Sequence, residues 1–110
     1  MSALGDALDR VWSLPGGARR EAGVQLYKVQ QGLEPSAWKP TGTVGSGVRE
    51  FRIREDGGAF RVLYVTQVAD AVVVLHAFEK KTKKTPRRDL DLADARLRAL
   101  DALERKERKR

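Results

Sequence analysis

The sequence predicts a small α+β domain, because segments with helical periodicity at both ends of the chain enclose three segments with strand-like patterns. The length of 110 residues suits one domain, and neither an internal repeat nor an interdomain linker is visible. We therefore expect residues 1–110 to form a single domain. Residues 105–110 are all charged, so we expect them to be a frayed basic tail.

Two helices are predicted in the N-terminal third of the chain. The first covers residues 2–12, and its apolar positions at helical spacing are Leu4, Leu8, Val11 and Trp12. Residues 13–17 break that pattern with proline and glycine. The second helix is expected over about residues 16–31, and Gly32 lies where a left-handed C-cap would end it. The apolar face of this helix comprises Ala22, Leu26, Val29 and Leu33.

A turn-rich segment precedes three predicted strands. Residues 33–46 contain two prolines and two glycines and are expected to form a surface loop. Trp38 in this loop is interpreted as a core residue rather than a platform for base stacking. The strands are predicted at 48–54, 60–66 and 72–78, with turns at 55–58 and 69–70. Together they would form an antiparallel meander with the second strand at its centre.

The last quarter of the chain is predicted to be one long helix. Thr85 is a suitable N-cap and Pro86 a suitable first helical residue. Beyond them, apolar residues recur every three or four positions, at Leu90, Ala93, Leu97, Leu100 and Leu103.

The composition favours a nucleic-acid partner. The formal net charge is +7 and the sequence pI is about 10.1, and each phosphate that a cation neutralises releases counterions. The alternative is that the charge serves solubility alone. The absence of cysteine excludes a disulfide scaffold and suits a reducing cytoplasm. The acidic N-terminal segment and the lack of a long apolar run indicate neither a secretory signal nor a membrane span.

The densest group of charges lies between the third strand and the last helix. Six of the nine residues from Lys80 to Arg88 are basic and none is acidic. Arg87 and Arg88 would lie in the first helical turn, where the helix dipole disfavours cations. An anionic ligand therefore explains them better than local stability does. A solvated loop is the alternative.

A second group of cations is predicted on the sheet. Arg52 and Arg54 share one face of the first strand with Glu50. Arg61 is the only charged residue in the otherwise apolar central strand, where an unpaired cation is costly. Two interpretations stay open. In the first, Glu50 is a structural partner of Arg61. In the second, Arg52, Arg61 and Lys80 converge on one phosphate.

His76 and the two tyrosines are weaker candidates. His76 is the only histidine and lies in an apolar strand, where a lone histidine is usually a satisfied core residue. Its ordinary pKa would also suit a general base or a phosphate contact. Tyr27 and Tyr64 are interpreted as packing residues. One histidine and no cysteine leave no recognisable metal site.

Parts of all three predicted strands resemble the phage-derived, HigB-like branch of the RelE/ParE toxins. The segments that carry the resemblance are Val48–Ile53, Phe60–Tyr64 and Val74–Pro86. The last is the most specific, because its apolar strand ends in the pattern His-x-Phe-x-Lys-Lys-Thr-x-Lys-Thr. The resemblance extends over about residues 15–100.

This resemblance implies a RelE-like fold, with two N-terminal helices packed on an antiparallel sheet of three to four strands and a C-terminal helix. It implies the toxin of a type II toxin–antitoxin pair, acting in the cytoplasm and neutralised by a cognate antitoxin, often a helix-turn-helix protein. Such a toxin would be an mRNA interferase, a ribosome-dependent endoribonuclease. It would cleave translated mRNA through the RNA's own 2′-hydroxyl, without a metal or cofactor.

The resemblance also suggests roles for individual residues. Arg61 would contact the scissile phosphate. Lys80 or Lys81 would stabilise charge or donate a proton, and Arg52 would hold the transition state or help to activate the nucleophile. The residues expected to hold the RNA backbone are Arg54, Lys83, Lys84 and Arg87.

The sequence departs from the family pattern in three places. It lacks the C-terminal tyrosine that some RelE-type toxins use in catalysis, and it has Glu50 where some relatives have lysine. Either change would weaken catalysis or shift roles to His76. It opens with helix-like sequence in place of a short N-terminal strand. Two alternative functions follow, a ParE-like inhibitor of DNA gyrase and a non-catalytic RNA-binding remnant. The basic residues favour the nuclease over the gyrase inhibitor, which needs no phosphate site.

Overall fold

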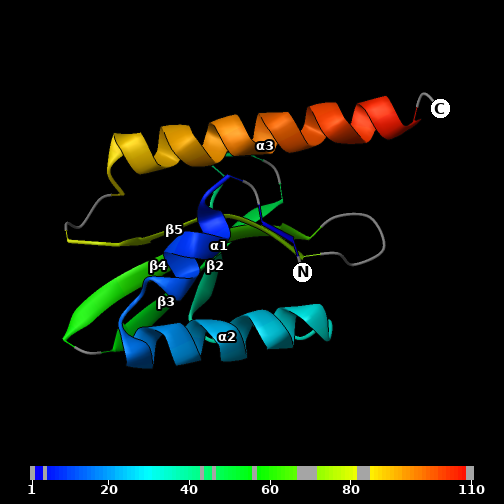
Figure 1. Cartoon of the computed structure of the whole chain (residues 1–110). Helices are drawn as coiled ribbons and strands as arrows, with labels where there is room; N and C mark the ends of the chain where they lie inside the picture. The colour runs from blue at the N-terminus through cyan, green and yellow to red at the C-terminus, as the bar shows by residue number, and fades with distance from the viewer. Residues whose placement is uncertain are drawn as a thin grey trace.

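A computed structural model describes residues 2–3, 5–42, 44–45, 47–55, 57–66, 72–81 and 85–108. The predicted α+β fold is confirmed. Figure 1 shows a sheet with one long C-terminal helix on one side and two N-terminal helices on the other.

The sheet has five strands in the order β1-β5-β4-β3-β2. They are β1 (Ser2–Ala3), β2 (Trp38–Pro40), β3 (Val48–Glu55), β4 (Gly58–Thr66) and β5 (Val72–Glu79). Strands β2 to β5 pair antiparallel, and β1 adds a parallel edge beside β5. The three strands predicted from the sequence are confirmed as β3, β4 and β5. The turn predicted at 69–70 lies outside the described residues.

The two short edge strands are not predicted by the sequence. Ser2 and Ala3, assigned there to a helix, form β1, so the N-terminal edge strand is present and helix α1 (Ala7–Trp12) begins later than expected. Residues 38–40, assigned there to a loop, form β2 against β3. Strands of two or three residues are too short to show periodicity, and their hydrogen bonds come from partners distant in the sequence.

Helix α2 (Gly16–Gln30) ends where the sequence predicts. Gly32 has a φ of +78°. Its N–H donates to the carbonyl of Val29 at 3.0 Å, and the N–H of Leu33 donates to the carbonyl of Lys28 at 2.9 Å. This pair of bonds is a Schellman motif, which places a left-handed residue after the C-cap and therefore favours glycine.

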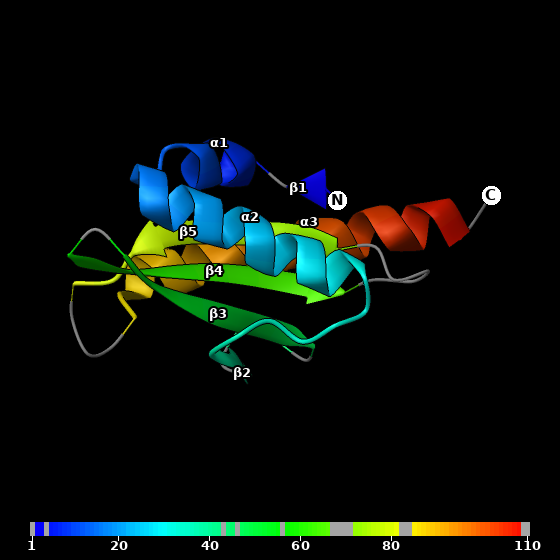
Figure 2. The ribbon, with the colours of Figure 1, turned by 90° about the horizontal axis from the view of Figure 1, so that it is seen from below.

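Each face of the sheet carries its own apolar core. In Figure 2, α2 lies in front of the sheet beside α1, and α3 (Arg87–Arg108) lies behind it. The core under α1 and α2 includes Ala7, Val11, Ala22, Leu26, Phe51, Val62 and Tyr64. The core under α3 includes Val48, Leu63, Val73, Leu75, Phe78 and Ala93, with Leu90 and Leu97 packed against it. The central strand β4 is thus covered on both faces, as its sequence predicts.

Four apolar residues assigned to helix faces are exposed instead. They are Leu8, Trp12, Leu33 and Leu103. Helix α1 is only six residues long and buries Ala7 and Val11, so its other side faces solvent. The C-terminal end of α3, drawn in red in Figure 1, extends past the sheet.

Helix α3 is anchored by one arginine. The Arg96 guanidinium donates to the carbonyl of Leu75 at 2.7 Å and forms an ion pair with Asp6, which precedes α1. The helix begins one residue after the predicted start, and the N–H of Leu90 donates to the carbonyl of Pro86. Residues 105–108, expected to fray, are helical.

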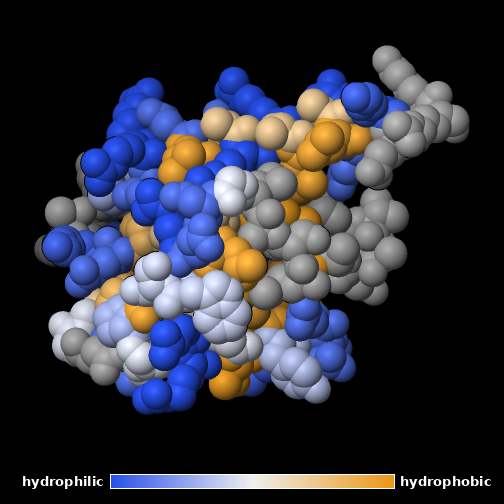
Figure 3. All heavy atoms as spheres, viewed as in Figure 1, coloured by the Kyte–Doolittle hydropathy of each residue, from blue (hydrophilic) through white to orange (hydrophobic). Residues whose placement is uncertain are grey.

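The outer side of α3 is hydrophilic, and hydrophobic residues lie between this helix and the strands (Figure 3). None of the described helices combines the length and the apolar character needed to cross a bilayer.

Candidate functional site

Cations from neighbouring strands lie on one face of the sheet, the face that packs on α3. Arg52 of β3 pairs directly with Arg61 of β4, and Arg61 pairs with Phe78 of β5. Directly paired residues share a face, and side chains alternate along a strand. The N–H of Lys80 donates to the carbonyl of Ala59 at 2.8 Å, so pairing continues past the end of β5. Lys80 therefore lies on the same face as Phe78, next to Arg61.

Glu50 links this group to the edge of the sheet. Its side chain is buried, and one carboxylate oxygen, Oε1, lies 3.3 Å from Nζ of Lys39 and 3.4 Å from Nη1 of Arg61. Lys39 is the cross-strand partner of Glu50 in β2. We define the cationic cluster as Lys39, Arg52, Arg61 and Lys80.

Arg61 is the most deeply buried member of the cationic cluster, with 7% of its surface exposed. Burial lowers the pKa of Arg61; Glu50 opposes this lowering, and Arg52 and Arg54 add to it. Its Nε has no hydrogen-bond partner among the described residues. A buried donor without a partner is costly, and an anion that reached this guanidinium after a small movement would satisfy it.

Lys80 is the member best suited to give up a proton. Burial lowers the pKa of Lys80, and the positive charges of Arg61 and Lys39 lower it further. A lower pKa makes the ammonium group a stronger acid, and general acids work best when their pKa is near the working pH.

The comparison with known families adds one finding to this geometry. The model of the family described as "Phage derived protein Gp49-like (DUF891)" matches residues 9–98. The chain belongs to this phage-derived Gp49-like family. The family is one of RelE/HigB-like toxins, so the match agrees at that level with the resemblance seen in the sequence. No curated protein matches the chain.

The matched region of this Gp49-like protein contains the whole cationic cluster. The structure shows the ion pair of the first interpretation of Arg61, and the binding of a phosphate by Arg52, Arg61 and Lys80 stays a prediction. Glu50 is the ion-pair partner of Arg61, and Arg52 and Lys80 lie beside Arg61 on the same face. The sequence did not point to Lys39, because β2 is too short for an alternating pattern to mark which residues face the cluster.

Lys81 does not join the cluster. Its side chain is 77% exposed and its Nζ lies 3.9 Å from Glu79. Of the two lysines predicted to donate a proton, Lys80 therefore lies next to Arg61 and Lys81 does not. A hollow of about 780 Å³ adjoins Lys80 at the turn between β3 and β4, and Arg54, Glu55, Glu79 and Lys81 line it.

The other predicted RNA contacts are more peripheral. Arg54 is exposed and close enough to Arg61 to affect its pKa. Arg87 is 91% exposed and lies 3.9 Å from Asp91 in the first turn of α3, so its charge is partly compensated within the helix. Lys83 and Lys84 lie outside the described residues.

His76 lies inside the core rather than at the site. It has no exposed surface, and its Nε2 lies 2.7 Å from Oδ1 of Asp89 in α3. Its ring stacks on Phe78 with 5.1 Å between ring centroids. Burial lowers the pKa of His76, although Asp89 opposes the shift. This environment favours the structural interpretation of His76 over a role as general base or phosphate contact.

The positions of Tyr64, Tyr27 and Trp38 test the packing roles that the sequence predicts for them. Tyr64 is buried on the opposite face of the sheet, as predicted, but Tyr27 is 62% exposed, so the packing role assigned to it is wrong. Trp38 is half-buried against the core under α1 and α2, which agrees with its interpretation as a core residue. In the part of the chain that the structure describes, no three His, Asp or Glu side chains are grouped to hold a metal ion.

Proposed function

We propose that the protein is the toxin of a type II toxin–antitoxin pair and cleaves translated mRNA on the ribosome. The observation that carries this proposal is the cationic cluster, in which four cations lie near one buried carboxylate and Arg61 has an unused donor. Membership of the Gp49-like family supports the toxin assignment. The cytoplasm would be its place of action, and a helix-turn-helix antitoxin its inhibitor.

The proposed reaction is transesterification by the RNA itself. The 2′-oxygen attacks the adjacent phosphorus, the bond from phosphorus to the 5′-oxygen breaks, and the products are a 2′,3′-cyclic phosphate and a 5′-hydroxyl. One proton leaves the 2′-hydroxyl and another reaches the departing 5′-oxygen. Negative charge builds up on the phosphoryl oxygens in the transition state, which nearby fixed cations stabilise.

The geometry suits a division of roles within the site. Arg61 binds the scissile phosphate, and Arg52, exposed beside it, stabilises the transition-state charge. Lys80 donates the proton to the 5′-oxygen. Glu50 acts as the general base, because it is the carboxylate that pairs with Lys39 and Arg61 of the cationic cluster. Both of its ion pairs involve Oε1, which leaves Oε2 to accept the 2′ proton.

The RNA backbone would run past the hollow beside Lys80. Arg54 and Lys81 line this hollow and would contact phosphates on either side of the scissile one. Lys83, Lys84 and Arg87 follow these residues in the sequence, and their RNA contacts stay predictions.

Primer extension on mRNA from cells that express the protein tests the activity. Cuts that follow the reading frame of translated messages are the expected result. DNA double-strand damage without RNA cuts would support the ParE-like gyrase inhibitor instead. Neither kind of damage would support an RNA-binding remnant of the fold.

Substitutions in the cluster test the site. Arg52→Ala, at an exposed position, should keep the fold, and Arg61→Lys keeps a charge beside Glu50 but loses the fork of donors. Arg52→Ala, Arg61→Lys and Glu50→Gln should each reduce the rate of mRNA cutting at least about tenfold. In such sites, loss of one stabilising donor lowers the rate by a factor of about 10²–10³. Arg19→Ala removes an exposed cation of α2, beyond the other face, and should cut normally. Undiminished cutting by soluble Arg52→Ala and Arg61→Lys proteins would overturn the assignment.

A further inference from the structure

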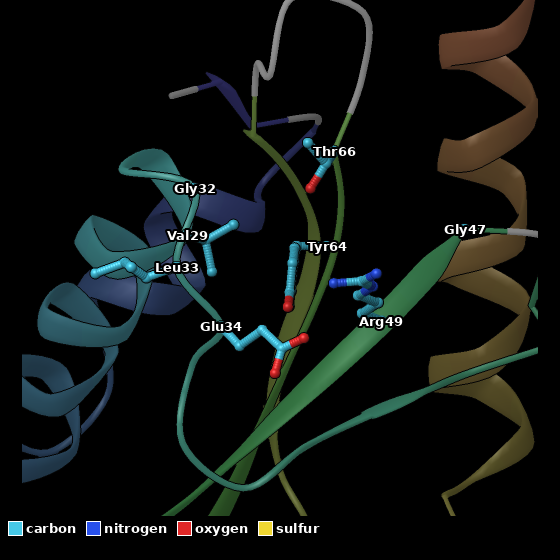
Figure 4. Close-up of a pocket in the computed structure, with 8 residues that line it drawn as sticks. All are labelled: Val29, Gly32, Leu33, Glu34, Gly47, Arg49, Tyr64 and Thr66. Atoms are coloured by element: carbon cyan, nitrogen blue, oxygen red, sulfur yellow. The ribbon is translucent and has the colours of Figure 1, made fainter.

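A second hollow lies on the opposite face of the sheet from the cationic cluster. It has a volume of about 370 Å³ and lies between the C-terminal end of α2 and strands β3 and β4 (Figure 4). The Val29 side chain lies on one side of the hollow and Arg49 on the other, and the Leu33 side chain points away from Tyr64. This volume falls within the usual range of small-molecule sites.

A buried hydroxyl without a partner faces this hollow. Tyr64 is 1% exposed and lines the hollow, and its Oη makes no hydrogen bond of normal geometry among the described residues, although Arg49 lies close enough as a donor to lower its pKa. Burial raises the pKa of Tyr64; Arg49 opposes this shift and Glu34 adds to it. The hydroxyl is therefore protonated at neutral pH and can donate. An unsatisfied buried hydroxyl costs free energy, which a bound polar atom would recover.

Arg49 and Glu34 carry opposite charges beside Tyr64, and the indole ring of Trp38 contacts both of them. The Arg49 guanidinium lies over the ring of Trp38, 4.4 Å from its centroid. The Nε1–H of Trp38 donates to Oε2 of Glu34 at 3.3 Å. In Figure 4 the Tyr64 hydroxyl points toward Glu34, and Arg49 lies beside the ring. Neither charge neutralises the other directly, since the structure records no ion pair between them within the described residues.

These charges restrict the chemistry of a ligand. A polyanion such as RNA would be repelled by Glu34, and a simple cation would be repelled by Arg49. A ligand that carries both charges satisfies both residues, and the apolar side chain of Val29 suits a hydrocarbon group.

We propose that this hollow binds a free α-amino acid with an aliphatic or aromatic side chain. Its carboxylate would pair with Arg49 and accept a hydrogen bond from the Tyr64 hydroxyl, and its ammonium group would pair with Glu34. Its side chain would pack against Val29. This site is separate from the cationic cluster and does not depend on the proposed nuclease activity.

Calorimetric titration of the full chain with L-phenylalanine and L-leucine tests the ligand class. Saturable binding of at least one of them is expected. L-Phenylalaninamide lacks the carboxylate and N-acetyl-L-phenylalanine lacks the ammonium group, so each should bind at least about tenfold more weakly than L-phenylalanine, as expected when a charge-assisted contact is lost. Absence of saturable binding of both amino acids up to ~10 mM, which corresponds to negligible affinity, would overturn the proposal. Equal binding of the blocked probes would overturn it as well.

Variants test the site itself. Tyr64→Phe removes only the unpaired hydroxyl and should weaken binding several-fold, and Glu34→Gln, at an exposed position, should weaken it at least about tenfold. Tyr27→Phe removes an exposed hydroxyl from α2 outside the hollow and should bind normally. If Tyr64→Phe proves unstable, Glu34→Gln alone decides. Unchanged affinity in Glu34→Gln would place any binding elsewhere and refute the proposal.

Discussion

At the scale of single residues, the buried pair of Glu50 and Arg61 is hard to explain by stability. Removing two charges from water costs several kcal/mol, and a buried ion pair of this kind is often no more stable than apolar residues of similar volume. Glu50 is 2% exposed and is shared with Lys39, yet the Nε of Arg61 has no partner among the described residues. An incompletely satisfied charge group in the sheet is better explained by a bound anion than by packing.

The buried His76–Asp89 pair predicts an acid-sensitive fold. Because the pKa of His76 is lowered in the folded protein, the unfolded chain binds this proton more readily below about pH 6.5. The stability associated with neutral His76 is therefore present above that pH and is lost as the pH falls. We expect the midpoint of thermal unfolding to drop between about pH 7 and pH 5, and to drop less in His76→Gln.

Circular dichroism melts of both proteins across this pH range measure the effect. The Asp6 carboxylate bears on the result only at lower pH, since the pKa of Asp6 is lowered from 3.8 by its hydrogen bonds with Arg96 and Arg10. Parallel pH curves for the two proteins would show that His76 does not titrate with unfolding.

At the scale of elements, the interior of α2 and its C-terminal end respond oppositely to an added methyl group. Gly32 has a left-handed backbone, so Gly32→Ala should destabilise the protein by about 1–2 kcal/mol even though no atom lies near the added methyl group. Gly23 lies within the helix and also faces open space, so Gly23→Ala should stabilise it by about 0.5–1 kcal/mol.

Urea unfolding of the two variants measures the change in the free energy of unfolding. The comparison is matched, because each variant adds only one methyl group. Equal effects of the same sign would mean that the C-terminal end of α2 does not depend on its Schellman motif. The same comparison shows how far a local sequence signal controls this element.

At the scale of the whole molecule, the charge distribution predicts how RNA binding depends on salt. The net charge of +7 favours binding to any polyanion, and each phosphate contact adds about 0.7 to the slope of log affinity against log salt for single strands. Arg52→Ala should therefore reduce this slope by about one contact, whereas Arg19→Ala on the α2 side should leave it unchanged. Fluorescence anisotropy with a single-stranded RNA between about 50 and 200 mM salt measures both slopes. An equal reduction in the two variants would indicate diffuse binding to the whole surface.

The sheet also divides the molecule into two sides with different chemistry. The face that packs on α3 carries the cationic cluster, and the face that packs on α2 carries the hollow with Tyr64. Arg49 and Glu50 are adjacent in β3 and face opposite sides, because side chains alternate along a strand. One strand therefore supplies residues to both sites.

Local patterns in the sequence determined the elements that are long enough to repeat. The alternation in β3, the apolar runs of β4 and β5, the spacing of three and four in α3 and the glycine after α2 each express a local rule of backbone geometry. Arg52, Arg61 and Lys80 were identified as candidates by their places in or after the predicted strands together with the family resemblance.

Only the tertiary structure decided which of these residues meet. Strand order and register decided that β1 and β2 form and that Lys39 lies in the cationic cluster. They also decided that Glu50 pairs with both Lys39 and Arg61, and that Lys80 rather than Lys81 lies beside Arg61. The burial of His76 against Asp89 depends on them as well. Hydrogen bonds between strands join residues that are far apart in the chain, so no local pattern encodes them. The composition of each site is therefore a property of pairing between elements, whereas the elements themselves follow from neighbouring residues.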